Sequence, residues 1–106
     1  MTESPTYNYE FYVAGVKFHQ LKEIIGELEV GNELILQPEP TNKFDPNAVK
    51  ILYDYEETPF MLGYVPAKIS ASVSASFEVG SCECIITELN PAEKPWLQLK
   101  VGIRSI

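Results

Sequence analysis

Aromatic and basic side chains stand close together at three separate places in this chain. In two of them a lysine directly precedes a phenylalanine, and in the third a tyrosine stands four residues before a lysine. Aromatic rings stack on nucleic-acid bases and ammonium groups attract phosphates, so these residue types together suit a single strand of nucleic acid. The candidate binding residues are Lys17, Phe18, Lys43, Phe44, Asp45, Tyr64 and Lys68.

Each candidate also has a purely structural interpretation. Phe18 and Tyr64 fit a core position as well as a binding surface, whereas Phe44 fits the core less well because it lies in a polar loop. Asp45 can cap a turn through an Asx-type hydrogen bond, and it can do so with or without binding a ligand. The lysines can be ordinary solvated side chains.

The net charge argues against a general nucleic-acid coat protein. Fifteen acidic residues face eight basic ones, which gives a formal net charge of −7. Such a body repels phosphate at long range, so any nucleic-acid site must be a local basic patch. The acidic residues gather in segments 23–33 and 54–57, which leaves lysines elsewhere free to form that patch.

The sequence carries no pattern that indicates catalysis, a cofactor or a metal. It has one histidine, His19, and neither a Gly-x-Ser-x-Gly motif nor a phosphate-binding loop. Cys82 and Cys84 are too few for a structural zinc site, and two positions apart on a strand they do not easily close a relaxed disulfide. We therefore expect a protein that is not an enzyme, with both cysteines as packing residues or inert thiols.

Length and hydropathy patterning predict one domain without a membrane segment. The 106 residues suit a single domain over 7–106, preceded by a flexible N-terminus over 1–6. No run of 18 apolar residues is present, and the first six residues lack the features of a secretory signal. A cytoplasmic location is the expectation.

Hydrophobic periodicity predicts short strands over 7–16, 34–36, 48–53, 60–65, 81–89 and 96–104. Segment 20–28 reads as a short helix and segment 54–59 as an acidic hairpin loop. Segment 66–77 alternates serine with apolar residues, but its alanines, Pro66 at the start and Gly80 after the end favour a helix. The pattern indicates a mainly β fold, a small closed or half-closed barrel with one or two short helices. Trp96 is expected to pack on the barrel end.

Three segments together resemble the HIRAN domain family. They are the opening segment FYVAGVKFH over 11–19, the segment EPTNKFDPNAVKI over 39–51 and the segment LGYVP over 62–66. Their order and spacing agree with the family, and the resemblance covers nearly the whole chain. It implies an OB-like β-barrel that spans the single domain.

The resemblance also implies a function and roles for individual residues. The family occurs in helicase-like DNA-repair remodelling enzymes, where it captures the 3′-hydroxyl end of single-stranded DNA, and in free-standing bacterial proteins. The position of Lys17 is then a phosphate contact and that of Phe18 an aromatic contact. The position of Phe44 stacks on a terminal base, and that of Asp45 accepts a hydrogen bond from the terminal nucleotide. Phenylalanine replaces tyrosine at 18 and 44, which keeps the ring and loses the hydroxyl group.

Two functions follow as hypotheses. The first is a DNA-binding module that recognises single-stranded DNA or its 3′ ends in DNA repair or replication-fork processing, with a repair or helicase protein as a further candidate partner. The second is a protein-interaction module with the same barrel and no affinity for nucleic acid. The paired lysines and aromatic residues favour the first, and the net charge of −7 favours the second.

Overall fold

The computed structural model describes residues 7–105, so the flexible N-terminus predicted for residues 1–6 lies outside the described residues. Short strands alternate with short helical segments, as the sequence predicts. In chain order the elements are β1 Tyr9–Tyr12, η1 Val16–Phe18, α1 Leu21–Ile24, η2 Ile25–Glu27, β2 Glu33–Pro38, β3 Val49–Tyr55, β4 Thr58–Tyr64, α2 Ala67–Val79, β5 Cys82–Leu89, η3 Pro95–Leu97 and β6 Leu99–Ser105, where η marks a 3-10 helix.

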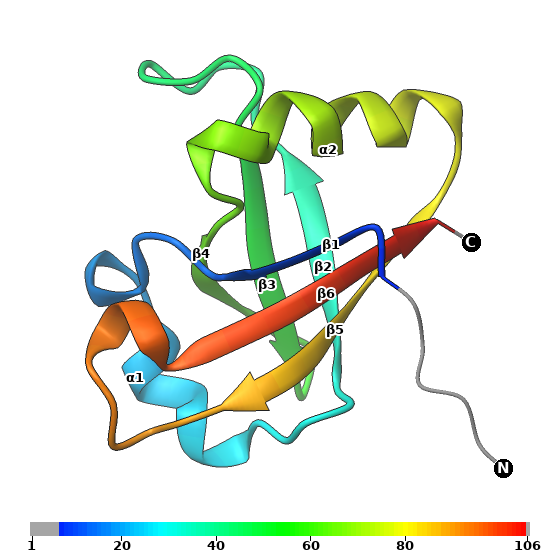
Figure 1. Cartoon of the computed structure of the whole chain (residues 1–106). Helices are drawn as coiled ribbons and strands as arrows, with labels where there is room; N and C mark the ends of the chain where they lie inside the picture. The colour runs from blue at the N-terminus through cyan, green and yellow to red at the C-terminus, as the bar shows by residue number, and fades with distance from the viewer. Residues whose placement is uncertain (1–6, 106) are drawn as a thin grey trace, which may run out of the picture.

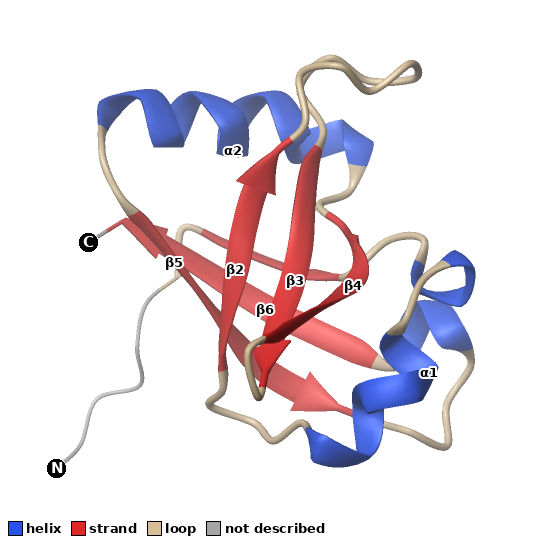
Figure 2. Ribbon diagram, turned by 180° about the vertical axis from the view of Figure 1, so that it is seen from behind, coloured by secondary structure: helices blue, strands red, loops and turns tan. Residues whose placement is uncertain are grey.

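The six strands form one antiparallel sheet in the order β1-β6-β5-β2-β3-β4. The sheet bends so that β2, β3 and β4 lie across β1, β6 and β5, with α2 over one end and α1 near the other (Figures 1 and 2). The prediction of a mainly β fold with short helices is therefore confirmed.

The two edges of the sheet meet at a single point. Ala14, just beyond β1, pairs with Tyr64 of β4, and each backbone N–H donates to the other residue's carbonyl oxygen over 2.9 Å. A Cβ atom on Gly63 would lie only 2.4 Å from the Ala14 carbonyl oxygen, so this close approach requires glycine. Because one bridge rather than a ladder joins these edges, the described chain forms a half-closed barrel.

Apolar side chains from every strand fill the inside of the bent sheet. Ile51, Leu62, Ile86 and Val101 are completely buried. Cys84 is buried with them, as expected of a packing residue, and burial raises the pKa of its thiol to about 12. In the described residues, no helix is long and apolar enough to cross a membrane.

The N-terminal elements are shorter than predicted. The strand expected over 7–16 ends at Tyr12, because the chain turns at Gly15, where a φ of 71° suits glycine, and enters η1. The helix expected over 20–28 divides into α1 and the 3-10 turn η2. Gly26 lies in that second part, and glycine disfavours a continuous helix.

Two predicted boundaries near turns are also wrong. The acidic loop expected over 54–59 is a two-residue turn, because β3 and β4 continue until only Glu56 and Glu57 connect them. Pro59 is accommodated in β4 because that strand lies at the sheet edge. The strand expected over 96–104 begins at Leu99, since Pro95 starts the 3-10 helix η3.

Candidate nucleic-acid interface

The turn at Gly15 carries the first lysine–phenylalanine pair out to the surface. Val16 is buried and anchors η1, while the Phe18 side chain is 75% exposed. The Lys17 ammonium lies 5.2 Å from the centre of the Phe18 ring, which is a cation–π distance. Phe18 is therefore a surface residue, and the interpretation of Phe18 as plain core is wrong.

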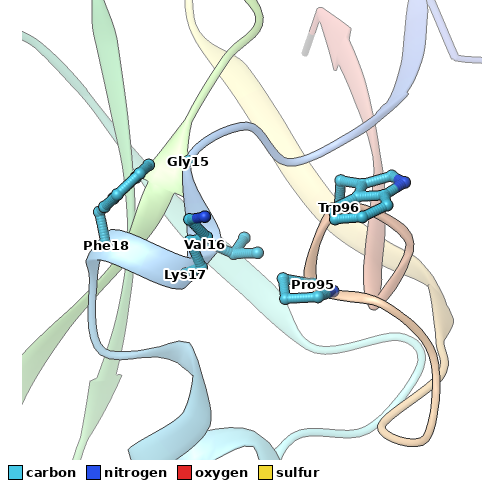
Figure 3. A pocket seen from close by; sticks show the side chains of 6 residues that line it. All are labelled: Gly15, Val16, Lys17, Phe18, Pro95 and Trp96. Carbon is cyan, nitrogen blue, oxygen red and sulfur yellow. The ribbon is translucent and has the colours of Figure 1, made fainter.

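Trp96 belongs to a second lysine–aromatic pair and lines an open hollow together with Phe18. Trp96 on η3 is 59% exposed, with the Lys94 ammonium 5.6 Å from the centre of its ring. Phe18 and Trp96 flank the hollow, whose volume is about 270 Å³ (Figure 3). We call this hollow the aromatic cleft; it is lined by Gly15, Val16, Lys17, Phe18, Pro95 and Trp96. Trp96 thus lines a surface hollow and is not packed away at the barrel end.

A second hollow adjoins the aromatic cleft at Gly15, which lines both. Its volume is about 200 Å³, and it brings Asp45 from the β2–β3 loop close to Tyr64 at the end of β4. We call it the Asp45 cavity; it is lined by Ala14, Gly15, Asp45, Ala48, Tyr64, Val65 and Ala67. The His19 and Tyr64 rings pack in a T-shaped arrangement, with ring centres 5.6 Å apart.

Side-chain hydrogen bonds build the loop that carries Phe44 and Asp45. The Asn42 Oδ1 atom accepts the backbone N–H groups of Phe44 and Asp45, both over 2.9 Å. Asp45 Oδ1 accepts the Asn47 N–H over 2.9 Å, and Asp45 Oδ2 accepts the Ser70 hydroxyl over 2.5 Å. The Asx-type cap is therefore present, and it ties the loop to the first turns of α2. The Phe44 ring is left 96% exposed.

Glu39, which sequence reasoning did not single out, joins this loop to β4. Its Oε1 accepts the Tyr64 hydroxyl over 2.8 Å and the Asn42 amide over 2.7 Å, and its Oε2 lies 3.0 Å from the Lys50 ammonium. Hydrogen bonds from Asn42, Lys50 and Tyr64 lower the pKa of Glu39 to about 2. Partial burial, and then the bond to Glu39, raise the pKa of Tyr64.

The structure brings some of the predicted site residues together and leaves others apart. Lys17 and Phe18 line the aromatic cleft, and Asp45 and Tyr64 line the Asp45 cavity. The remaining three predicted residues line neither hollow and are exposed: Lys43 and Phe44 on the β2–β3 loop, and Lys68 in the first turn of α2. Lys68 directly follows Ala67, which lines the Asp45 cavity.

The three predicted lysines take part in none of the ion pairs that the described residues form. Among residues 7–105, ion pairs join Glu39 to Lys50 and Glu83 to Arg104. Those lysines therefore keep their charge available to a ligand. Within the same residues no three His, Cys, Asp or Glu side chains are grouped to hold a metal ion.

Comparison with known proteins gives one family match and one curated relative. The HIRAN domain family matches residues 6–104. A Fanconi-associated nuclease 1 homolog from Oryza sativa subsp. japonica is 32% identical over 72 residues. Those residues cover 68% of this chain but only 7% of that relative, so this chain spans a small part of the nuclease homolog.

Two solved structures share the fold. A protein from Lactobacillus plantarum superposes with a TM-score of 0.76 at 20% identity, covering 92% of this chain and 91% of that one. The HIRAN domain of human HLTF superposes with a TM-score of 0.66 at 13% identity, covering 90% of this chain and 71% of that one. At such identities the two structures establish a common architecture alone.

The family match confirms the resemblance carried by segments 11–19, 39–51 and 62–66. HIRAN domains are associated with DNA binding in repair and remodelling proteins, and the domain itself is not catalytic. Because the match extends over almost all of the described residues, this chain belongs to the HIRAN domain family.

Proposed function

We propose that this chain is a non-catalytic module that binds the 3′ end of single-stranded DNA in DNA repair or replication-fork processing. One observation carries the proposal: the aromatic cleft and the Asp45 cavity adjoin at Gly15. A hollow suited to stacking a base thus opens directly beside a hollow that presents a carboxylate.

The aromatic cleft has the two features that a single strand requires. Phe18 and Trp96 offer exposed rings from opposite sides, and base–aromatic stacking is typically worth about 1–3 kcal/mol per base. Lys17 and Lys94 lie beside those rings, where their ammonium groups can meet phosphates. Stacking tolerates any base, so this cleft favours strand binding without strong sequence preference.

The Asp45 cavity suits the hydroxyl group at the end of a strand. A carboxylate repels phosphate, so its presence beside a DNA site makes sense where a hydroxyl donor is recognised. Each Asp45 oxygen accepts one described hydrogen bond and retains a second lone pair for a ligand. The exposed Phe44 ring beside Asp45 can stack on the last base, although it lacks a phenol group.

Fluorescence anisotropy with a short single-stranded oligonucleotide at low salt tests strand binding. With two to four phosphate contacts, the slope of log affinity against log salt should be shallower than about −3. Lys17→Glu should weaken binding at low salt without changing thermal unfolding, whereas Lys22→Glu, the same charge reversal at an exposed α1 residue that lines neither hollow, should have less effect. Wild-type protein that binds no oligonucleotide would instead support a protein-interaction module, which the net charge of −7 favours.

Matched oligonucleotides with 3′-hydroxyl and 3′-phosphate ends test end recognition. A 3′-phosphate places like charges beside Asp45 and should weaken wild-type binding by about 1–3 kcal/mol. Asp45→Asn keeps an acceptor for the turn and should abolish the difference while the fold stays intact. If the two ends bind wild type equally, Asp45 acts as a turn cap alone.

A further inference from the structure

Glu39 lines neither hollow, yet its contacts reach both walls of the Asp45 cavity. It directly follows β2, and its backbone N–H donates to the Ala48 carbonyl over 2.8 Å, which closes the base of the 39–48 loop. Its carboxylate receives the hydroxyl group of Tyr64, a residue that lines the cavity. The same carboxylate receives the side-chain amide of Asn42.

The Asn42 side chain connects Glu39 to the tip of the loop. Its amide is planar, so the bond from Nδ2 to Glu39 fixes where Oδ1 points. Oδ1 accepts the backbone N–H groups of Phe44 and Asp45, which sets the course of the chain at these two residues. Glu39 therefore connects the two proposed end-recognition residues of the loop to Tyr64.

We propose that Glu39 is the positioning residue of this site: it holds the Asn42–Asp45 tip at a fixed place relative to Tyr64 and so determines 3′-end discrimination without touching DNA. This inference rests on the proposed function, because it concerns how that same site reads the end of a strand.

A carboxylate suits this role better than an amide. Three donors converge on Glu39, from Asn42, Tyr64 and Lys50, and none of its described side-chain contacts requires a donor in return. Hydrogen bonds to an ionised group are roughly twice as strong as neutral ones. Glutamine would place an NH₂ group either against Lys50 or against the Asn42 and Tyr64 donors, and its remaining neutral oxygen accepts more weakly, so Glu39→Gln should loosen the network in either orientation.

The sign of the effect separates positioning from simple electrostatics. Glu39→Gln removes one negative charge from a chain of net charge −7, so electrostatics alone predicts tighter binding of DNA. Loss of positioning predicts weaker binding instead. Glu33→Gln is the matched control, because Glu33 is an exposed acidic residue at the start of β2 and lines neither hollow.

The experiment compares wild type, Glu39→Gln and Glu33→Gln for affinity to 3′-hydroxyl and 3′-phosphate oligonucleotides, salt slope and thermal unfolding. Glu39→Gln should bind the 3′-hydroxyl strand roughly 5- to 10-fold less tightly, as expected for one or two lost hydrogen bonds, and its ratio between the two ends should approach one. Its salt slope should equal that of wild type, because the lysine contacts remain. A general loss of structure would change slope, stability and both affinities together.

Asn42→Asp keeps the proposal testable should Glu39→Gln unfold, because it retains the oxygen that accepts the Phe44 and Asp45 N–H groups and removes only the amide donor to Glu39. It should abolish end discrimination in the same way and speed hydrogen exchange of the Phe44 and Asp45 amides. Either variant retaining wild-type discrimination would overturn the role of Glu39. Wild type that itself shows no discrimination would overturn end recognition first, which is a separate failure of the proposed function.

Discussion

The two ends of β3 carry connections of opposite design. At the start of this seven-residue strand, the 39–48 loop is built by side-chain hydrogen bonds and leaves Phe44 projecting into solvent. At its other end, the turn to β4 consists of Glu56 and Glu57 alone, with positive φ angles of 51° and 68°. The strand separates these connections by roughly 20 Å, and Figure 2 shows them at opposite ends of the fold.

The two connections differ in what they present at the surface. The 39–48 loop, which lies near the two hollows, is long enough for the side chains of Asn42 and Asp45 to accept backbone N–H groups in place of backbone carbonyl oxygens. These hydrogen bonds shape the surface. The turn at the far end has no room for such a network, and it presents two carboxylates to solvent. The turn therefore places two negative charges at one end of β3, while the loop places an exposed Phe44 ring at the other.

The largest effect is expected where the barrel closes beneath the hollows. In Gly63→Ala the new Cβ would lie 2.4 Å from the Ala14 carbonyl oxygen, and backbone cannot move aside as a flexible side chain can. We expect the free energy of unfolding to fall by about 3 kcal/mol, the upper range for overpacking. Urea denaturation measures this, with Gly80→Ala as control because nothing lies within 4 Å of its Cβ position. Equal stability of the two variants would contradict the close approach.

The next effect concerns affinity rather than stability. Phe44→Ala removes a ring that is 96% exposed, so thermal unfolding should not change. If the ring stacks on a terminal base, DNA affinity should fall by about 1–3 kcal/mol. Phe44→Tyr adds a hydroxyl group to the ring and should bind at least as tightly as wild type. Unchanged anisotropy titrations for Phe44→Ala would remove Phe44 from the interface.

At the opposite end of β3 a substitution should increase stability. Positive φ angles cost a residue other than glycine roughly 1–2 kcal/mol, and two-residue turns of this kind favour Asn-Gly. Glu57→Gly should therefore raise the free energy of unfolding by about 1 kcal/mol, since φ at this position is 68°. DNA affinity should stay constant at moderate salt. A loss of stability in urea denaturation would show that the Glu57 side chain makes a compensating contribution.

The same turn shows which parts of the fold the sequence can predict. Period-two alternation identifies β6, and alanine content with Pro66 and Gly80 identifies α2, because these signals are local. Neither residue of this turn, Glu56 or Glu57, is a glycine or an asparagine, so no local signal predicts a tight turn. The loop predicted from the sequence is therefore too long.

The site depends on contacts that no local pattern records. Phe18 is exposed because the chain turns outward at Gly15. Trp96 lines the cleft because η3, which is distant from η1 in the sequence, lies beside it in the fold. Motif spacing identified Lys17, Phe18 and Asp45 as candidates. Glu39 was missed because its partners Lys50 and Tyr64 are distant in sequence. The sequence thus identifies the residue types of a candidate site, whereas the way the fold groups them depends on contacts between distant segments.

The smallest expected effect tests whether charge at the far turn reaches the hollows. Two unit charges 20 Å apart in water interact by only about 0.2 kcal/mol, and salt at 0.1 M screens them over about 10 Å. Replacing both Glu56 and Glu57 with glutamine should therefore tighten DNA binding by less than about twofold at 0.01 M salt, where the screening length is about 30 Å. At 0.1 M salt the effect should vanish. Paired anisotropy titrations of wild type and this variant at the two salt concentrations measure it, with Glu39→Gln as a contrast that should weaken binding at both. A large gain at 0.1 M salt would place DNA near the acidic turn and contradict the contrast between the two ends of β3.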